Sequence, residues 1–245
     1  MRAISASIRG SEHAALDINN QDAHIVIQKP DYTILVLCDG VTNGKEYRTS
    51  HNEAAAWMQA TLVASALDHY ARDLMPLDAM PYALSKRIDL YYRQILNFIS
   101  PPSYVEYANH YLAATLLTAV LRPDDGIIMA AGDGIIQIDD SIMWLDQHGE
   151  PRCPVFNQFR EQRMDIHRFD SWNKVGLMSD GMYPRITRDD DQFDHARFRT
   201  LVEDFLWWKT TSSDLKRQLN IWQREDHPYF YDDATVVLAM KEPYL

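Results

Sequence analysis

The chain has 245 residues, of which 46% are hydrophobic, and its formal net charge of −11 reflects 24 Lys and Arg against 35 Asp and Glu. This length can bury a substantial core, and no linker rich in Gly, Ser or Pro divides it, so we expect one domain over residues 1–245. The negative charge argues against a nucleic-acid or anionic-membrane partner, because both require clustered Lys and Arg.

Cysteine content and hydropathy bear on the cellular compartment. Cys38 and Cys153 are the only cysteines, too few for a disulfide framework, and they form no Cys-x-x-Cys pair. The polar segment 1–9 lacks the apolar stretch of a signal peptide, and no run of about 18 apolar residues occurs. We therefore expect a cytoplasmic protein whose thiols are reduced.

The first half of the chain predicts a hairpin followed by two helices. Strand-like segments at 23–28 and 32–38 flank a short turn that contains a proline. A capping box at 50–53 precedes apolar residues at helical spacing over 54–70. A second helical pattern covers 82–98 and stops before two prolines.

The second half predicts mostly short strands joined by sharp turns, which indicate antiparallel neighbours. In chain order we expect strands at 112–121, 127–131, 135–138, 142–145, 164–169, 174–179 and 234–240, an irregular stretch at 146–163, and helices at 194–208 and 213–224. Sequential strands with grouped helices are typical of an α+β fold in which helices cover two packed antiparallel sheets. A parallel doubly wound sheet would need strands and helices to alternate.

Acidic residues recur where apolar runs end. Three runs stop at an Asp-Gly pair, and a fourth acidic pair stands just before the last strand: Asp39-Gly40, Asp133-Gly134, Asp180-Gly181 and Asp232-Asp233. A single Asp-Gly pair is most often a turn, and Asp133-Gly134 fits a hairpin because apolar residues lie on both sides. Polar or irregular sequence follows the other two pairs, so there the aspartate ends a buried strand without starting a hairpin.

If these strand ends meet at one rim, their carboxylates would repel one another unless cations held them together. Mg²⁺ and Mn²⁺ take oxygen ligands, and a glycine lets a backbone carbonyl approach closely. Two such ions about 4 Å apart can share a carboxylate, lower the pKa of a bridging water and neutralise a phosphoryl group under attack. The chain has no dinucleotide or Walker-type phosphate loop, no zinc-protease motif and no serine-hydrolase elbow.

Six short segments, taken in order, resemble motifs of the metal-dependent type 2C protein phosphatases, the PPM family. They are Asn20-Gln21-Asp22-Ala23, the first Asp-Gly strand at 36–40, the segment 114–120, the Gly132-Asp133-Gly134 turn, the second Asp-Gly strand at 175–181, and Asp232-Asp233-Ala234-Thr235-Val236-Val237. The last segment is similar to the family's Asp-Asn-x-Thr-Val. The segments span nearly the whole chain, and they are most similar to a divergent bacterial branch of the family.

The resemblance implies a four-layer αββα sandwich, two antiparallel β-sheets flanked by helices, that hydrolyses phosphoserine and phosphothreonine. The attacking water would bridge two Mg²⁺ or Mn²⁺ ions, held by Asp39 and Asp22. The family's metal ligands carry over by position to Asp22, Asp39, Gly40, Asp180 and Asp232, with Asp133 for a third ion. Asp39 would bridge both ions, whereas Asp22 would act on the second ion through water.

Three departures from the family pattern concern the site. Gln21 replaces the usual Glu, and Val41 stands where many eukaryotic members have a His proposed as general acid, so water would protonate the leaving alkoxide. The Arg that commonly grips the phosphate before the Asn-Glu-Asp motif is missing. His13 is a candidate substitute for substrate binding, Arg9 is a weaker one, and the alternative for His13 is a plain surface residue.

Two functional hypotheses follow. The first is a Mg/Mn-dependent serine/threonine protein phosphatase, whose partners would be a phosphorylated protein substrate and a cognate Ser/Thr kinase. The second is a catalytically weak module of the same fold that regulates a kinase or another partner by binding. The retained carboxylates favour the first hypothesis, and the missing Arg favours the second.

Overall fold

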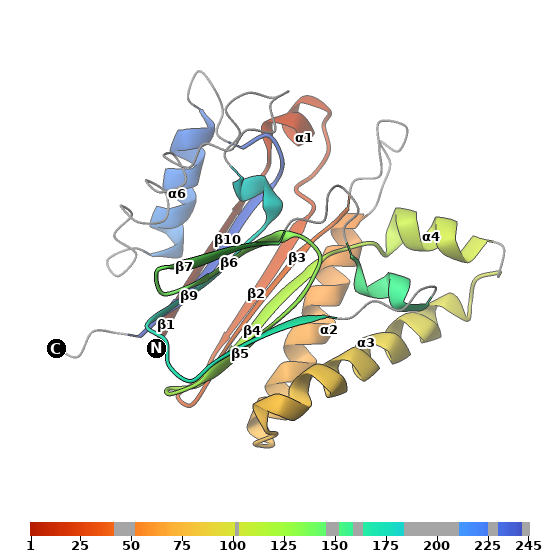
Figure 1. The fold of residues 1–245 in the computed structure, drawn as a ribbon. Helices are drawn as coiled ribbons and strands as arrows, with labels where there is room; N and C mark the ends of the chain where they lie inside the picture. The colour runs from red at the N-terminus through yellow and green to blue at the C-terminus, as the bar shows by residue number, and fades with distance from the viewer. Residues whose placement is uncertain are drawn as a thin grey trace.

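The computed structural model describes residues 1–41, 52–100, 103–145, 152–158, 164–183, 211–224 and 230–241. Within these residues, two five-stranded sheets pack face to face and helices cover both outer faces (Figure 1). The expected αββα sandwich is therefore confirmed. No helix among the described residues is long and apolar enough to cross a membrane.

One sheet, called the β3 sheet here, contains the predicted hairpin. Its strands run in the order β2-β3-β4-β5-β8, and every neighbouring pair is antiparallel. Their bounds are β2 Asp22–Gln28, β3 Thr33–Asp39, β4 Leu116–Leu121, β5 Gly126–Ala131 and β8 Asp165–Phe169. The predicted strand at 112–121 begins four residues late, because 112–115 form a turn and an isolated bridge.

The second sheet, called the β10 sheet, joins the two ends of the chain. Its order is β1-β10-β9-β6-β7, again with antiparallel neighbours only. The bounds are β1 Arg2–Ile8, β6 Gly134–Ile138, β7 Ser141–Leu145, β9 Lys174–Met178 and β10 Ala234–Met240. β1 was not predicted, and it pairs along its whole length with the last strand, β10.

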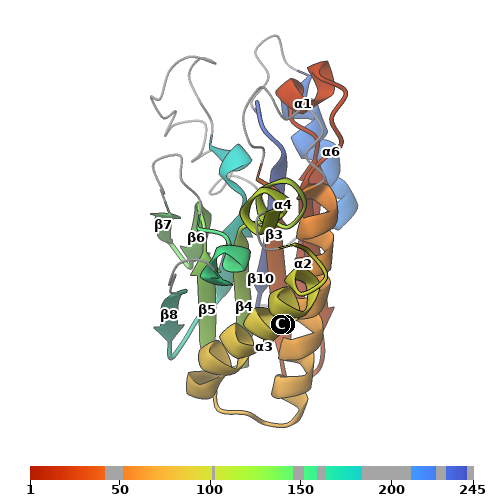
Figure 2. The same cartoon turned by 90° about the vertical axis from the view of Figure 1, so that its right-hand side faces the viewer.

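Helices α2 (Asn52–Arg72) and α3 (Met80–Leu96) cover the outer face of the β3 sheet, and α6 (Ser212–Gln223) covers that of the β10 sheet (Figures 1 and 2). α4 (Tyr104–Tyr111) and α1 (Ser11–Ala15) were not predicted. Three short 3-10 turns complete the described elements: η1 Leu77–Ala79, η3 Pro154–Gln158 and η4 Asp180–Met182. The helix expected at 194–208 lies outside the described residues.

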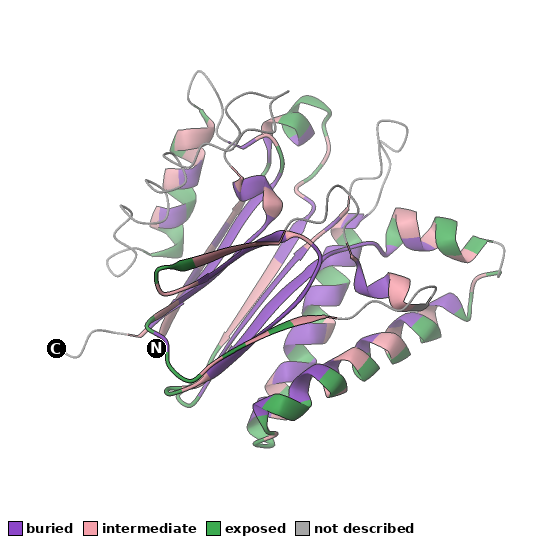
Figure 3. Ribbon diagram, viewed as in Figure 1, coloured by how far each residue is buried: buried purple, intermediate pink, exposed green. Residues whose placement is uncertain are grey.

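The core lies in three layers because strand side chains alternate between faces. On β3, Ile34, Val36 and Cys38 pack toward α2 and α3, whereas Leu35 and Leu37 pack against the β10 sheet. A third cluster joins the outer face of the β10 sheet to α6. The five β3 side chains named above are fully buried. Figure 3 shows that the strands form the buried centre of the molecule.

The hairpin predicted at Asp133-Gly134 is wrong. β5, which ends at Ala131, pairs with β4 and β8, whereas β6, which starts at Gly134, pairs with β7 and β9. The chain therefore crosses from one sheet to the other at Asp133. Gly132 and Gly134 have φ of 126° and 128°, which favours glycine at both ends of the crossing.

Candidate metal centre

The site begins where β3 ends. Asp22 and Asp39 are directly opposed in the antiparallel register of β2 and β3, so their side chains share one face. By alternation from Leu37, that face is the one turned toward the β10 sheet. Two hydrogen bonds to Thr115 hold Asp39 in place: the Thr115 N–H donates to the Asp39 carbonyl at 2.8 Å, and the Asp39 N–H donates to Thr115 Oγ1 at 3.2 Å.

Ser179 connects this edge to the β10 sheet. It follows β9, and its hydroxyl donates to Asp22 Oδ2 at 2.9 Å while its Oγ accepts the N–H of Thr235 at 2.9 Å. The next residue, Asp180, begins the η4 turn. The ends of β2, β3, β9 and β10 thus meet at one end of the sandwich, the upper end in Figure 1.

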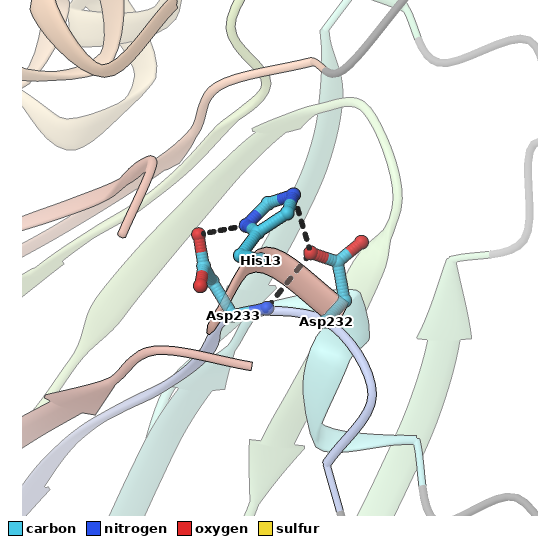
Figure 4. A group of neighbouring side chains, drawn as sticks. All are labelled: His13, Asp232 and Asp233. Carbon is cyan, nitrogen blue, oxygen red and sulfur yellow. Dashed lines mark hydrogen bonds and ion pairs between the residues drawn. The ribbon is translucent and has the colours of Figure 1, made fainter. Parts of the chain in front are cut away.

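Asp233 organises the segment before β10. Its carboxylate accepts three hydrogen bonds: from Gly10 N–H at 2.9 Å, from Gln21 N–H at 2.5 Å, and from His13 Nδ1 at 2.7 Å. Figure 4 draws the bond from His13. The backbone packs tightly here, because a Cβ on Gly181 would lie 1.9 Å from the carbonyl oxygen of Asp233. Only a glycine at 181 lets η4 approach so closely.

His13 lies between two carboxylates. It sits on α1 with 5% of its surface exposed, so the alternative of a plain surface residue is wrong. Nδ1 contacts Asp233, and Nε2 lies 3.6 Å from Asp232 Oδ1 (Figure 4). Burial lowers the pKa of His13, but the hydrogen bond to Asp233 and the surrounding carboxylate charges outweigh burial and raise it.

The carboxylates destabilise one another's charged form. Burial raises the pKa of Asp39 well above its usual range, and the charges of Asp22, Asp180, Asp232 and Asp133 add to the shift. These four are the aspartates expected to share ions with Asp39, so the fold brings the other four predicted carboxylates into electrostatic reach of Asp39. We call this group, Asp22, Asp39, Asp133, Asp180 and Asp232, the acidic rim.

Two further members of the acidic rim behave in the same way. Burial and the charge of Asp233 raise the pKa of Asp22 well above its usual range, although the Thr235 and Ser179 hydroxyls oppose the shift. Partial desolvation also raises the pKa of Asp232, although its side chain is 53% exposed and the neighbouring His13 opposes the shift. Asp22 Oδ1 is buried without a hydrogen-bond partner among the described residues. Such an oxygen is costly unless something positive contacts it, so the donor set fits divalent cations.

The remaining predicted positions lie beside the acidic rim. Gly40 N–H donates to the Gln21 carbonyl at 3.2 Å, and a Cβ on Gly40 would lie 2.6 Å from the Asn52 carbonyl oxygen. Arg9 donates to the Ile18 carbonyl. Val41 brings no proton donor, as expected. The ligand role of the Gly40 carbonyl stays a prediction.

Sequence reasoning missed Asp233 and Ser179 as parts of the site. A signal for Asp233 exists, because it occupies the place of Asn in the closing motif, and a buried carboxylate there requires donors or a cation. The family's phosphate-binding Arg is missing, and Asp233 stands in place of the Asn of the closing motif. His13 and Asp233 therefore form a pair that the family pattern does not contain. No comparable signal marks Ser179, which only the packing of the two sheets brings to Asp22.

Comparisons with known proteins agree with the observed fold. The family model described as Protein phosphatase 2C matches residues 9–222. A bacterial serine phosphatase structure is similar at 18% identity and a TM-score of 0.64, covering 100% of both chains. Stp1 from Staphylococcus aureus, a serine/threonine phosphatase, has 18% identity and a TM-score of 0.62, covering 99% of this chain and 96% of its own.

The catalytic domain of the serine/threonine phosphatase PstP, solved with two manganese ions, has 17% identity and a TM-score of 0.59, covering 98% of this chain and 97% of its own. No curated protein matches significantly. At these identities the structural likeness concerns the fold alone. The fold is that of the PPM-type phosphatases. The family match covers most of the sequence, and this chain belongs to the Protein phosphatase 2C family.

Proposed function

We propose that this protein is a metal-dependent phosphatase that hydrolyses phosphoserine and phosphothreonine in proteins. One observation carries the proposal: carboxylates from both sheets converge so closely that burial and the charges of neighbouring carboxylates raise the pKa of Asp39 and Asp22 well above the usual range. Such a cluster lowers stability unless cations bind to it, so its presence favours a role that needs those cations.

The acidic rim would hold two Mg²⁺ or Mn²⁺ ions. Asp39, placed among the other four carboxylates, would contact both ions, with Asp180 and Asp232 on the first and Asp22 serving the second. When bound, these ions would lower the pKa of a water and neutralise the phosphoryl group. Asp133, at the crossing between the sheets, and Asp180 would serve a third ion.

The surrounding residues hold the carboxylates in place. The Ser179 hydroxyl donates a hydrogen bond to one oxygen of Asp22. Backbone N–H groups and His13 donate to Asp233, the residue next to Asp232. Second-sphere hydrogen bonds of this kind orient ligands before substrate arrives. Val41 offers no acid, so the leaving alkoxide would take its proton from water. The predicted phosphate contact of His13 stays a prediction.

The partner would be a phosphorylated protein, and the kinase that phosphorylates it would be functionally paired with this chain. A binding-only role gains no support from the site, because a module without metal chemistry has no use for five mutually repelling carboxylates. PstP, a structure with manganese bound, supports Mn²⁺ as the first ion to test.

The test is hydrolysis of para-nitrophenyl phosphate and of a phosphothreonine peptide with Mn²⁺, before and after addition of a chelator. Asp39→Asn should lose at least about 100-fold in turnover, because it removes the ligand shared by both ions. The matched control is Asp31→Asn, at the exposed opposite end of the same hairpin, which should keep full activity.

Absence of both turnover and metal binding in the native chain would overturn the proposed function. Activity on para-nitrophenyl phosphate and small phosphorylated metabolites, without activity on the peptide, would keep the metal chemistry and overturn the protein-substrate assignment.

A further inference from the structure

The imidazole of His13 is held so that one nitrogen faces the acidic rim. Nδ1 lies 2.7 Å from Asp233 Oδ2, a distance that requires a hydrogen bond. Both oxygens of Asp233 already accept backbone N–H groups, from Gly10 and Gln21, so Asp233 is the acceptor in this bond and His13 Nδ1 is the donor. With Nδ1 protonated, neutral His13 presents the lone pair of Nε2.

Nε2 faces Asp232, the carboxylate assigned to the first ion. The 3.6 Å between Nε2 and Asp232 Oδ1 is too long for a hydrogen bond. It is close to the spacing of two ligands on a single ion, since donor atoms each about 2.1 Å from a metal lie about 3 to 3.5 Å apart. The donor atoms of His13, Asp232 and Asp233 all lie within 4.8 Å of one another.

Within this group, Asp233 is not the second ligand. Both of its oxygens are engaged, Oδ1 by Gly10 and Oδ2 by Gln21 and His13, and it is 2% exposed. A carboxylate that accepts from one imidazole nitrogen while the other nitrogen binds a metal is a common arrangement around metal-bound histidines. Asp233 is therefore a positioning residue, and Asp232 and His13 are the pair turned toward the cation.

We propose that His13, oriented by Asp233, supplies a nitrogen ligand to the ion that Asp232 binds, so that the centre prefers Mn²⁺ or another borderline transition ion to Mg²⁺. This inference rests on the proposed function, because it presupposes the metal centre. Imidazole suits transition ions, whereas Mg²⁺ takes oxygen ligands almost exclusively. A second observation calls for a cation at the same end of the sandwich: the buried Oδ1 of Asp22, the carboxylate assigned above to the second ion, has no hydrogen-bond partner among the described residues.

The test uses the full chain loaded with Mn²⁺ and measures electron spin echo envelope modulation, which detects nitrogen bound to the ion. The native protein should show ¹⁴N modulation that changes to a ¹⁵N pattern when histidine is labelled. His13→Gln should lose the modulation, and the control His69→Gln, an exposed histidine on α2, should keep it. Far-UV circular dichroism establishes that each variant is folded.

Affinities measured by titration calorimetry give a second readout. His13→Gln should weaken Mn²⁺ binding by about 10-fold or more and change Mg²⁺ binding by about 3-fold or less. Asp233→Asn should weaken Mn²⁺ binding by about 10-fold while the ¹⁴N modulation persists, because it disturbs the orientation of the ligand and not the ligand itself.

The outcomes separate this inference from the proposed function. Mn²⁺ binding without histidine modulation in the native protein overturns the inference alone; a raised KM of His13→Gln for para-nitrophenyl phosphate would then assign His13 to the phosphate. Modulation that survives in His13→Gln also overturns it, since another histidine would be the ligand. Should His13→Gln fail to fold, the labelled native protein and His13→Asn decide the question. No Mn²⁺ binding at all overturns the metal centre itself.

Discussion

The interior between the two sheets and the acidic rim are built from the same strands but have opposite energetics. Along β3, Leu35 and Leu37 are fully buried against the β10 sheet, and two residues later Asp39 ends the strand on the same face among four other carboxylates. Burial of the leucines stabilises the fold, whereas burial of Asp39 opposes ionisation and destabilises it. The sandwich therefore supports a rim that would not be stable by itself.

The largest effect should come from the interior. Leu37→Ala removes a side chain that is 0% exposed between the sheets, and we expect the free energy of unfolding to fall by about 2 to 5 kcal/mol. Urea unfolding, with and without Mn²⁺, measures the change. The loss should be the same under both conditions, since Leu37 lies in the apolar interior. If Mn²⁺ restored the lost free energy of unfolding, the stability of the interior would depend on the rim, contrary to this comparison.

Metal binding should produce the next largest effect, and it should arise at the rim alone. With Mn²⁺ at about 100 times its Kd, the free energy of unfolding should rise by about 2.7 kcal/mol through binding to the folded state. A chelator should abolish the gain, and Asp39→Asn should not show it. Differential scanning calorimetry of the native chain, Asp39→Asn and the Asp31→Asn control compares the three. An equal gain in Asp39→Asn would place the ion elsewhere.

Local features of the fold could be predicted from the sequence, whereas the pairing of distant segments could not. The apolar run of β3 and the helical spacing of α2 are local patterns, so they could be predicted from the residues. The partner of a strand is not local: the apolar runs around Asp133 fit a hairpin, and only the sheet pairing shows that the chain changes sheet there. β1 was missed although its residues alternate between buried apolar and more polar positions, because the segment is short and its partner, β10, follows more than 220 residues later.

At the site, strand-end aspartates could be predicted, because each follows a recognisable apolar run. The residues that orient them could not. Ser179 reaches Asp22, and Gly10 and His13 reach Asp233, through contacts more than 150 residues apart in the sequence. Such pairs depend on how β1 pairs with β10 and on how the two sheets stack, and nothing local in the chain specifies them.

A smaller effect, of opposite sign to the first, should follow from neutralising one rim charge. Asp22→Asn removes a buried carboxylate whose pKa is raised by burial and by neighbouring carboxylates. Without metal, the variant should be more stable than the native chain by about 1 to 2 kcal/mol. Urea unfolding in chelator measures the difference, and with Mn²⁺ the order should reverse. A metal-free variant less stable than the native chain would show that the hydrogen bond from Ser179 outweighs the repulsion.

The smallest expected effect concerns His24, which lies on β2 between the rim and the interior. Burial, and then the charge of Lys216 on α6, lower its pKa, and its Nδ1 is buried without a hydrogen-bond partner among the described residues. The unfolded chain therefore binds a proton more readily than the folded one below about pH 6.5. Stability contributed by neutral His24 is complete above that pH and is lost as the pH falls toward the lowered pKa.

The raised pKa values of His13 and the rim aspartates act in the opposite direction, because those groups bind protons more readily in the folded state. The measurement is therefore the difference between native chain and His24→Gln in chelator, at pH 7.5 and pH 5.5, where the shared contributions cancel. The native chain should lose about 1 kcal/mol or less relative to the variant on acidification. An unchanged difference would mean that His24 has the same charge in the folded and unfolded states. The part of β2 around His24 would then respond to pH like the apolar interior.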